Sequence, residues 1–191
     1  MSKGRLEAFS DGVIAILITI MVLELRPPHE ADLSALRPLL PVLLSYLLSF
    51  VYLGIYWNNH HHMLQAAEYV DGRVLWANLH LLFWLSLVPF VTAWMGENRF
   101  AALPVAVYGV VLALAGVAYF ILARLLVALH GQGSALGVAF GSDFKGKASV
   151  LIYLLAIPLA FVRPWLACAL YVVVALVWFA PDPRIEKTIE R

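Results

Sequence analysis

Charge and cysteine are both scarce in this 191-residue chain. Only 13% of the residues are Asp, Glu, Lys or Arg, which is about half the ~25% usual for a soluble domain. The net charge of +1 excludes a broad basic surface, so no nucleic-acid partner is expected. The single cysteine, Cys168, excludes an intrachain disulfide and is interpreted as a small apolar filler.

Motifs for cofactor chemistry are missing too. The sequence contains no G-x-G-x-x-G, no nucleotide-binding loop, no H-E-x-x-H and no cysteine cluster, so neither a cofactor nor a metal is predicted. The opening residues 1–7 lack the basic region and cleavage site of a secretory signal, and they are interpreted as mature structure.

What the chain has instead is apolar sequence, at 63% of its residues. Spanning a ~30 Å hydrocarbon layer takes ~20 apolar residues per helix. The apolar runs cover residues 6–25, 38–57, 74–95, 103–129, 148–162 and 165–180. These runs predict an all-α membrane protein with six transmembrane helices in one domain, residues 1–191.

The connections between the runs carry their own signals. Residues 26–37 contain proline and charge, and the glycine-containing stretch 131–147 is interpreted as a loop. The Arg163-Pro164 pair predicts a tight break between the last two runs, which makes a helical hairpin. Small residues at Gly109, Ala113 and Gly116 would allow close helix approach.

Basic residues predict the orientation, because positively charged loops stay in the cytoplasm. On the side of the N-terminus lie Lys3, Arg5, Arg73, Arg124, Lys145, Lys147, Arg184, Lys187 and Arg191, and on the other side lie Arg26, Arg37, Arg99 and Arg163. This asymmetry and the even number of spans place both termini in the cytoplasm.

The first run carries an acidic residue inside an apolar span. Asp11 lies about one and a half turns into the helix, where a carboxylate facing lipid costs up to a few kcal/mol. It must therefore face protein or water and have a partner, for which Arg5 and Ser10 are local candidates. The presence of Asp11 in the span fits a buried network that holds the helices together, and it fits a helix that lines a pore equally well.

Helical periodicity puts an apolar stripe on the opposite side from Asp11. At about 100° per residue from Asp11, the angles are about 140° for Ile16, 180° for Ile20, 120° for Leu23, 160° for Phe9 and 80° for Thr19. If Asp11 faces its own subunit, the stripe faces either lipid or a symmetry axis. Pattern alone favours lipid or core contact.

Three motifs resemble the lysosomal potassium channel family and its bacterial relatives. The first run contains R-x-x-x-F-S-D as Arg5, Phe9, Ser10 and Asp11. Residues 57–64 resemble the W-x-x-H-H-x-x-L that ends the family's second helix, and Asn78 with Pro89-Phe90 resembles the N…P-F of its third. The second half of the chain is similar only in its number of helices.

The resemblance implies a potassium channel in the plasma membrane of a prokaryote. Four identical six-helix subunits would form a homotetramer in the lipid bilayer, with the first helix of each lining a central pore. The constriction would lie at Ile16, Ile20 and Leu23, and the Thr19 hydroxyl would contribute to selectivity. An apolar collar favours potassium modestly, because potassium loses water more cheaply than sodium.

By the same resemblance, Ser10 and Asp11 do not touch the ion but tie the first helix to its neighbours. The expected partners on the third helix are Asn78, His80 and Trp84. The run His60-His61-His62 is not expected to bind a metal, because successive side chains on a helix point about 100° apart. Tryptophans near span ends, including Trp57, fit an aromatic belt.

Other functions are open at this point. The same pore would also carry protons. A proton-coupled transporter is an alternative suggested by Asp11 and His80, although no inverted repeat supports it. A lipid enzyme is disfavoured, because Ser10 and Asp11 project about 100° apart and no histidine is placed to activate the serine.

Overall fold

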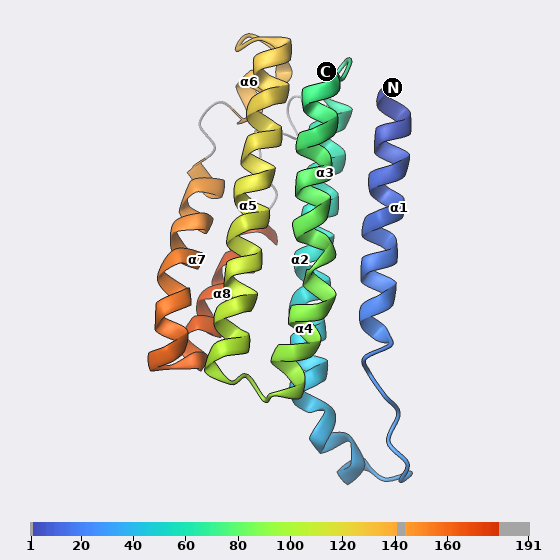
Figure 1. Cartoon of the computed structure of the whole chain (residues 1–191), viewed down its shortest axis with the longest axis vertical. Coiled ribbons are helices and arrows are strands. Elements are labelled where there is room, and N and C mark those ends of the chain that lie inside the picture. Colours follow the sequence, from blue (N-terminus) through green and yellow to red (C-terminus); the bar gives the residue numbers. More distant parts are fainter. Residues whose placement is uncertain (1, 141–143, 180–191) are drawn as a thin grey trace.

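The computed structural model describes residues 2–140 and 144–179, and nearly all of them are helical (Figure 1). The elements are α1 (Lys3–Val22), the 3-10 helix η1 (Leu33–Leu39), α2 (Leu40–Gln65), α3 (Gly72–Ser86), α4 (Val88–Glu97), α5 (Ala102–His130), α6 (Ala135–Phe140), α7 (Phe144–Val162) and α8 (Pro164–Phe179). The expected all-α class is confirmed, since these residues contain no strand.

Four helical stretches within the described residues are long and apolar enough to cross a membrane. They are Leu33–Gln65, Gly72–Glu97, Ala102–His130 and Phe144–Val162. The helix α8 is apolar but shorter, with 16 residues, and α1 carries four charged residues between Lys3 and Asp11. The chain is therefore a membrane protein, and the count of six spans stays a prediction.

Two connections differ from the sequence-based expectation. The run 74–95 is divided at Leu87 into α3 and α4, because Pro89 lacks the N–H that a continuous helix needs. The stretch 131–147 is not simply a loop: it contains α6 and the start of α7. Ser134 stabilises the first turn of α6, since its hydroxyl accepts the Gly137 N–H at 3.1 Å.

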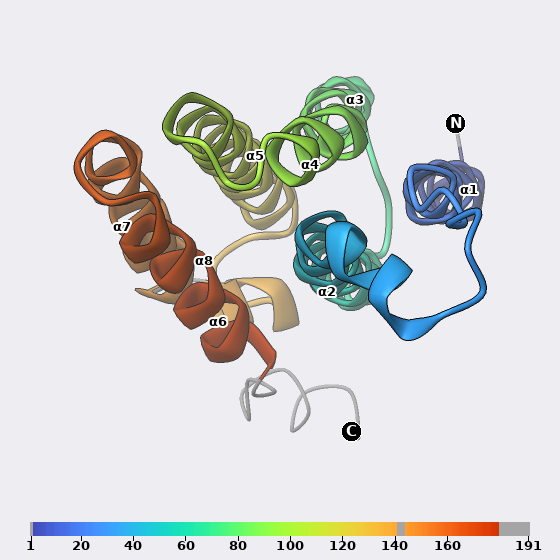
Figure 2. The same ribbon diagram turned by 90° about the horizontal axis from the view of Figure 1, so that it is seen from below.

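The helices of this bundle run roughly along one axis, and the start of α1 lies at the same end as the start of α3 and the end of α5 (Figure 1). Seen along that axis, α1 lies at one edge beside α2, α3 and α4, and α7 and α8 lie at the other edge (Figure 2). Among the basic residues that predict the membrane orientation, Arg184, Lys187 and Arg191 lie outside the described part of the chain.

The helix α5 packs closely against its neighbours because of its small residues. A side chain at Gly109 would collide with the Tyr171 hydroxyl of α8, and one at Gly116 would press on Val150 of α7. This confirms that small residues on this helix permit close approach.

The turn between α4 and α5 has an unusual backbone. Arg99 and Phe100 have φ angles of 49° and 59°, a left-handed conformation that is uncommon for residues other than glycine. The Phe100 ring is buried and packs on Trp165, at the start of α8, with ring centroids 5.0 Å apart. This contact joins the α4–α5 turn to the α7–α8 turn.

Candidate functional site

The first helix buries a single stripe of residues against its own subunit. Its buried residues are Leu6, Ser10, Ile14, Leu17 and Met21. Their spacing of three and four residues is that of a single helix face. All other described side chains of α1 are partly or fully exposed, so this helix presents most of its surface away from the bundle.

At its N-terminal end, α1 is fixed to the end of α2 by Lys3. The ammonium group donates to the carbonyl oxygens of Gln65, at 3.1 Å, and Ala67, at 2.8 Å. These carbonyls end a helix, where a positive charge is favourable. The Glu7 carboxylate lies 3.8 Å from the same ammonium.

A buried hydrogen-bonded chain joins α1 to α3 and α2. The Ser10 hydroxyl accepts from the side-chain amide of Asn78 at 2.9 Å and donates to the Leu6 carbonyl at 2.8 Å. Because the Asn78 amide nitrogen is the donor to Ser10, its oxygen accepts from His60 Nε2, 2.7 Å away. All three side chains are almost completely buried, so each polar group depends on the others.

Asp11 has a partner that the sequence did not indicate. Its carboxylate accepts from the indole N–H of Trp57 on α2, at 3.0 Å. Trp57 was expected in an aromatic belt, and its ring is 45% exposed, but its polar edge is turned to α1. Neither Arg5 nor Ser10 bonds to the Asp11 side chain within the described residues.

Of the three expected partners on α3, only Asn78 contacts the motif. His80 Nε2 accepts from the Trp84 indole N–H at 2.9 Å, within one turn of the same helix. His80 is exposed and Trp84 half-buried. They lie on a face of α3 that does not point to Ser10 and Asp11, so the locking network is made by Ser10, Asn78, His60, Asp11 and Trp57.

The predicted constriction residues lie on the exposed face of α1. Ile16 is 57% exposed, Ile20 42% and Leu23 73%, and Phe9 is 48% exposed on the same side. Leu23 lies one residue beyond the helix, where it forms the C-cap. Thr19 is also exposed, and its hydroxyl donates to the Ile16 carbonyl at 2.9 Å. Among the described helices, none covers this stripe.

The three histidines of α2 point in different directions. This helix continues beyond the predicted span 38–57 to Gln65, so it includes residues 57–64, which resemble the end of the family's second helix. His60 reaches Asn78, while His61 stacks on Trp57 with centroids 6.1 Å apart. His62 Nδ1 is buried without a hydrogen-bond partner. Within the described residues, no three His, Cys, Asp or Glu side chains gather where they could hold a metal.

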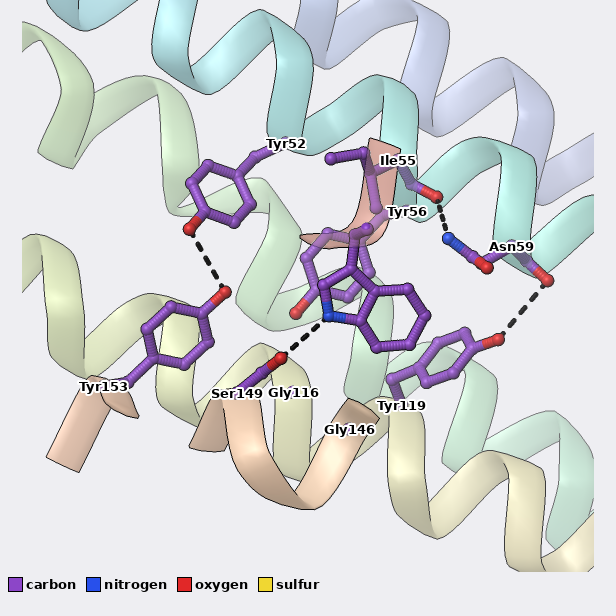
Figure 3. Close-up of a pocket in the computed structure, with 10 residues that line it drawn as sticks. Tyr52, Ile55, Tyr56, Asn59, Gly116, Tyr119, Gly146, Ser149 and Tyr153 are labelled. Carbon is purple, nitrogen blue, oxygen red and sulfur yellow. Dashed lines mark hydrogen bonds between the residues drawn. The ribbon is translucent and has the colours of Figure 1, made fainter. Parts of the chain in front are cut away.

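A second polar cluster lies far from α1, between α2, α5, α7 and α8 (Figure 3). Tyr153 donates to the Tyr52 hydroxyl at 3.2 Å, Tyr52 donates to the Tyr171 carbonyl at 2.6 Å, and the Trp178 indole donates to Ser149 at 2.8 Å. The cavity beside them, of about 40 Å³, has room for a few waters. Sequence patterns gave no sign of this cluster, because isolated tyrosines resemble core residues.

Comparison with known proteins agrees with this geometry. The family model of the endosomal/lysosomal potassium channel TMEM175 matches residues 5–89, which contain α1 from Arg5 onward, its exposed stripe and the hydrogen-bonded chain. A potassium channel from Chryseobacterium sp. (strain P1-3) is 52% identical over 190 residues, covering 100% of this chain and 99% of that protein. The zebrafish endosomal/lysosomal proton channel TMEM175 is 27% identical over 135 residues, 68% of this chain and 25% of that protein.

A solved structure is similar along almost the whole chain. It is the crystal structure of a lysosomal potassium-selective channel TMEM175 homolog from Chamaesiphon minutus, with a TM-score of 0.80 and 28% identity. The match covers 92% of this chain and 95% of that one. These relatives are channels and not enzymes. The chain belongs to the family of the endosomal/lysosomal potassium channel TMEM175.

Proposed function

We propose that this chain is one subunit of a potassium-permeable channel in which four copies surround a pore lined by α1. The observation that carries the proposal is the uncovered stripe of Ile16, Ile20 and Leu23 on a helix that is fixed to its subunit by the opposite face. The names of the Chryseobacterium and Chamaesiphon relatives support potassium as the ion. The prokaryotic plasma membrane, with cytoplasmic termini, is the proposed location.

In this arrangement the buried chain and the pore stripe have separate tasks. Ser10, Asn78 and His60 fix the rotation of α1 about its own axis. That rotation turns Ile16 and Ile20 to the central axis, where four isoleucine rings form an apolar collar. An ion loses part of its water there, which is cheaper for potassium than for sodium. Thr19 hydroxyls, whose lone pairs remain exposed, return some coordination.

Recording from purified protein in planar bilayers tests this proposal. Ile16→Asn should reduce potassium-over-sodium selectivity, because four amides hydrate the collar and lower the dehydration cost. Val22→Asn is the matched control: Val22 is 45% exposed on α1 but lies about 120° from Ile16 around the helix. An unchanged reversal potential in Ile16→Asn, or the same shift in both variants, would contradict the collar.

Proton conduction through the same pore is the second candidate. It is favoured by the name of the zebrafish relative, a proton channel. A pH gradient imposed without a potassium gradient separates the two, since a proton current moves the reversal potential with pH. Single-channel currents far above carrier turnover rates would exclude a proton-coupled transporter.

A further inference from the structure

One basic residue of α1 lies on the exposed stripe. With Asp11 at zero, Arg5 falls at about 120° around the helix, the same angle as Leu23 and about 20° from Ile16. Arg5 is exposed, and its guanidinium makes no hydrogen bond or ion pair within the described residues. Within the described residues, the motif residue Arg5 therefore has no polar partner in its own subunit.

The neighbouring charges do not neutralise it. Lys3 and Glu7 face each other at 3.8 Å, and Lys3 is also bonded to the carbonyls at the end of α2. The Asp11 carboxylate is turned to Trp57, on the far side of the helix from the stripe. Arg5 thus keeps its full positive charge at the N-terminal end of the surface that carries Ile16.

We propose that four Arg5 side chains form a positive ring at the N-terminal mouth of the pore, which limits the rate at which potassium enters from that side. This inference rests on the proposed tetramer with α1 at its axis. Arg5 and Ile16 are eleven residues apart, about 16 Å along the helix, so the ring acts through its field and not by contact at the collar. A ring of like charge lowers the local concentration of cations at a mouth.

Ionic strength distinguishes a field from a steric effect. The screening length is about 30 Å at 0.01 M salt and about 3 Å at 1 M. Arg5→Gln should therefore raise single-channel conductance on the order of three- to tenfold near 0.01 M potassium and leave it unchanged near 1 M. The increase should appear mainly at the voltage polarity that drives potassium into the N-terminal mouth. Arg5→Lys, which keeps the charge, should behave as the unmodified channel.

Arg124→Gln is the matched control. Arg124 is also an exposed guanidinium without an ion pair in the described residues, and it contacts only the Phe120 ring, at 6.0 Å. It lies on α5, six residues before this helix ends at His130, and the end of α5 lies at the same end of the bundle as the start of α1 but away from it (Figures 1 and 2). Its substitution should leave the conductance at low salt unchanged.

Chemical modification tests the charge in a channel that has already folded. Arg5→Cys can be labelled with a cationic or an anionic thiol reagent, because the other cysteine, Cys168, is buried. The cationic label should lower the low-salt conductance and the anionic label should raise it. Three results would overturn the proposed ring. They are equal effects of the two labels on conductance, a conductance increase in Arg5→Gln that persists at 1 M potassium, and the same conductance increase in Arg124→Gln. A silent unmodified channel would instead contradict the proposed function.

Discussion

The helices α1 and α5 are both apolar, yet the bundle uses them in opposite ways. In α5, fifteen of 29 residues are buried and they cover most of the helix circumference, leaving one narrower exposed face that contains Val110, Val117 and Ile121. In α1, only five of 20 are buried, all in one stripe. The better-packed helix contacts α3, α4, α7 and α8, and the less packed one carries the R-x-x-x-F-S-D motif. A face that must meet ions or another subunit cannot also be packed inside its own subunit.

Glycine substitutions in the two helices should give the largest contrast. Gly109→Ala in α5 places a methyl group on the Tyr171 hydroxyl and disturbs the bond from that hydroxyl to the Val105 carbonyl. We expect a loss of about 1–3 kcal/mol in stability. Gly12→Ala in α1 meets nothing within 4 Å and should be neutral or stabilising by up to about 1 kcal/mol.

The measurement is the thermal unfolding midpoint of each purified variant in detergent. A lower midpoint in Gly109→Ala together with an equal or higher midpoint in Gly12→Ala would support the difference in packing between α5 and α1. A comparable loss in Gly12→Ala would mean that the exposed face of α1 is tightly packed in the assembled protein at this position.

Asn78→Ala should have the next largest effect, because it removes the centre of the chain that fixes α1. The Ser10 hydroxyl and the His60 ring each lose a buried partner. We expect a loss of about 1–2 kcal/mol, together with weaker ion selectivity as α1 gains rotational freedom. His80→Ala on the same helix is the control, since His80 bonds only to Trp84. Equal losses of stability and ion selectivity in Asn78→Ala and His80→Ala would contradict the separate roles of Asn78 and His80.

Trp57→Phe should have the smallest effect. It keeps an aromatic ring but removes the N–H that bonds to Asp11. The site is partly exposed, so water replaces much of the lost bond, and we expect about 0.5–1 kcal/mol. Trp94→Phe, whose ring stacks on Phe90, removes an indole without such a bond. If Trp57→Phe and Trp94→Phe have the same thermal unfolding midpoint, the Trp57–Asp11 bond makes no measurable contribution to stability.

Sequence patterns predicted the orientation of α1 better than its partners. Helical periodicity sets which residues share a face: it put Ile16 and Ile20 opposite Asp11, and both are exposed, while Asp11 bonds to Trp57 of its own subunit. Periodicity is silent on which neighbouring helix lies opposite. The bond from Trp57 to Asp11 depends on the rotation of α2, which continues beyond the apolar run 38–57 to Gln65 and buries Met63 and Leu64 there.

The second half of the chain was predicted least well. The helix α6 has six residues, too few for a periodic signal, and it lies where glycines indicated a loop. The tyrosine cluster brings Tyr52 together with Tyr153 and Tyr171, which lie 101 and 119 residues further along the chain. Such contacts follow from how helices pack and leave no local trace in the sequence.

The left-handed turn at Arg99 and Phe100 bears on how the protein can be engineered. The Phe100 ring packs against Trp165, so the α4–α5 turn and the α7–α8 turn contact each other. An insertion in one turn would therefore displace the other. Residues 26–32, which follow the proposed pore residue Leu23 and precede η1, are mostly exposed and lie at the same end of the bundle (Figure 1). A fluorescent tag or antibody epitope should therefore be tolerated in that loop and rejected at the aromatic corner.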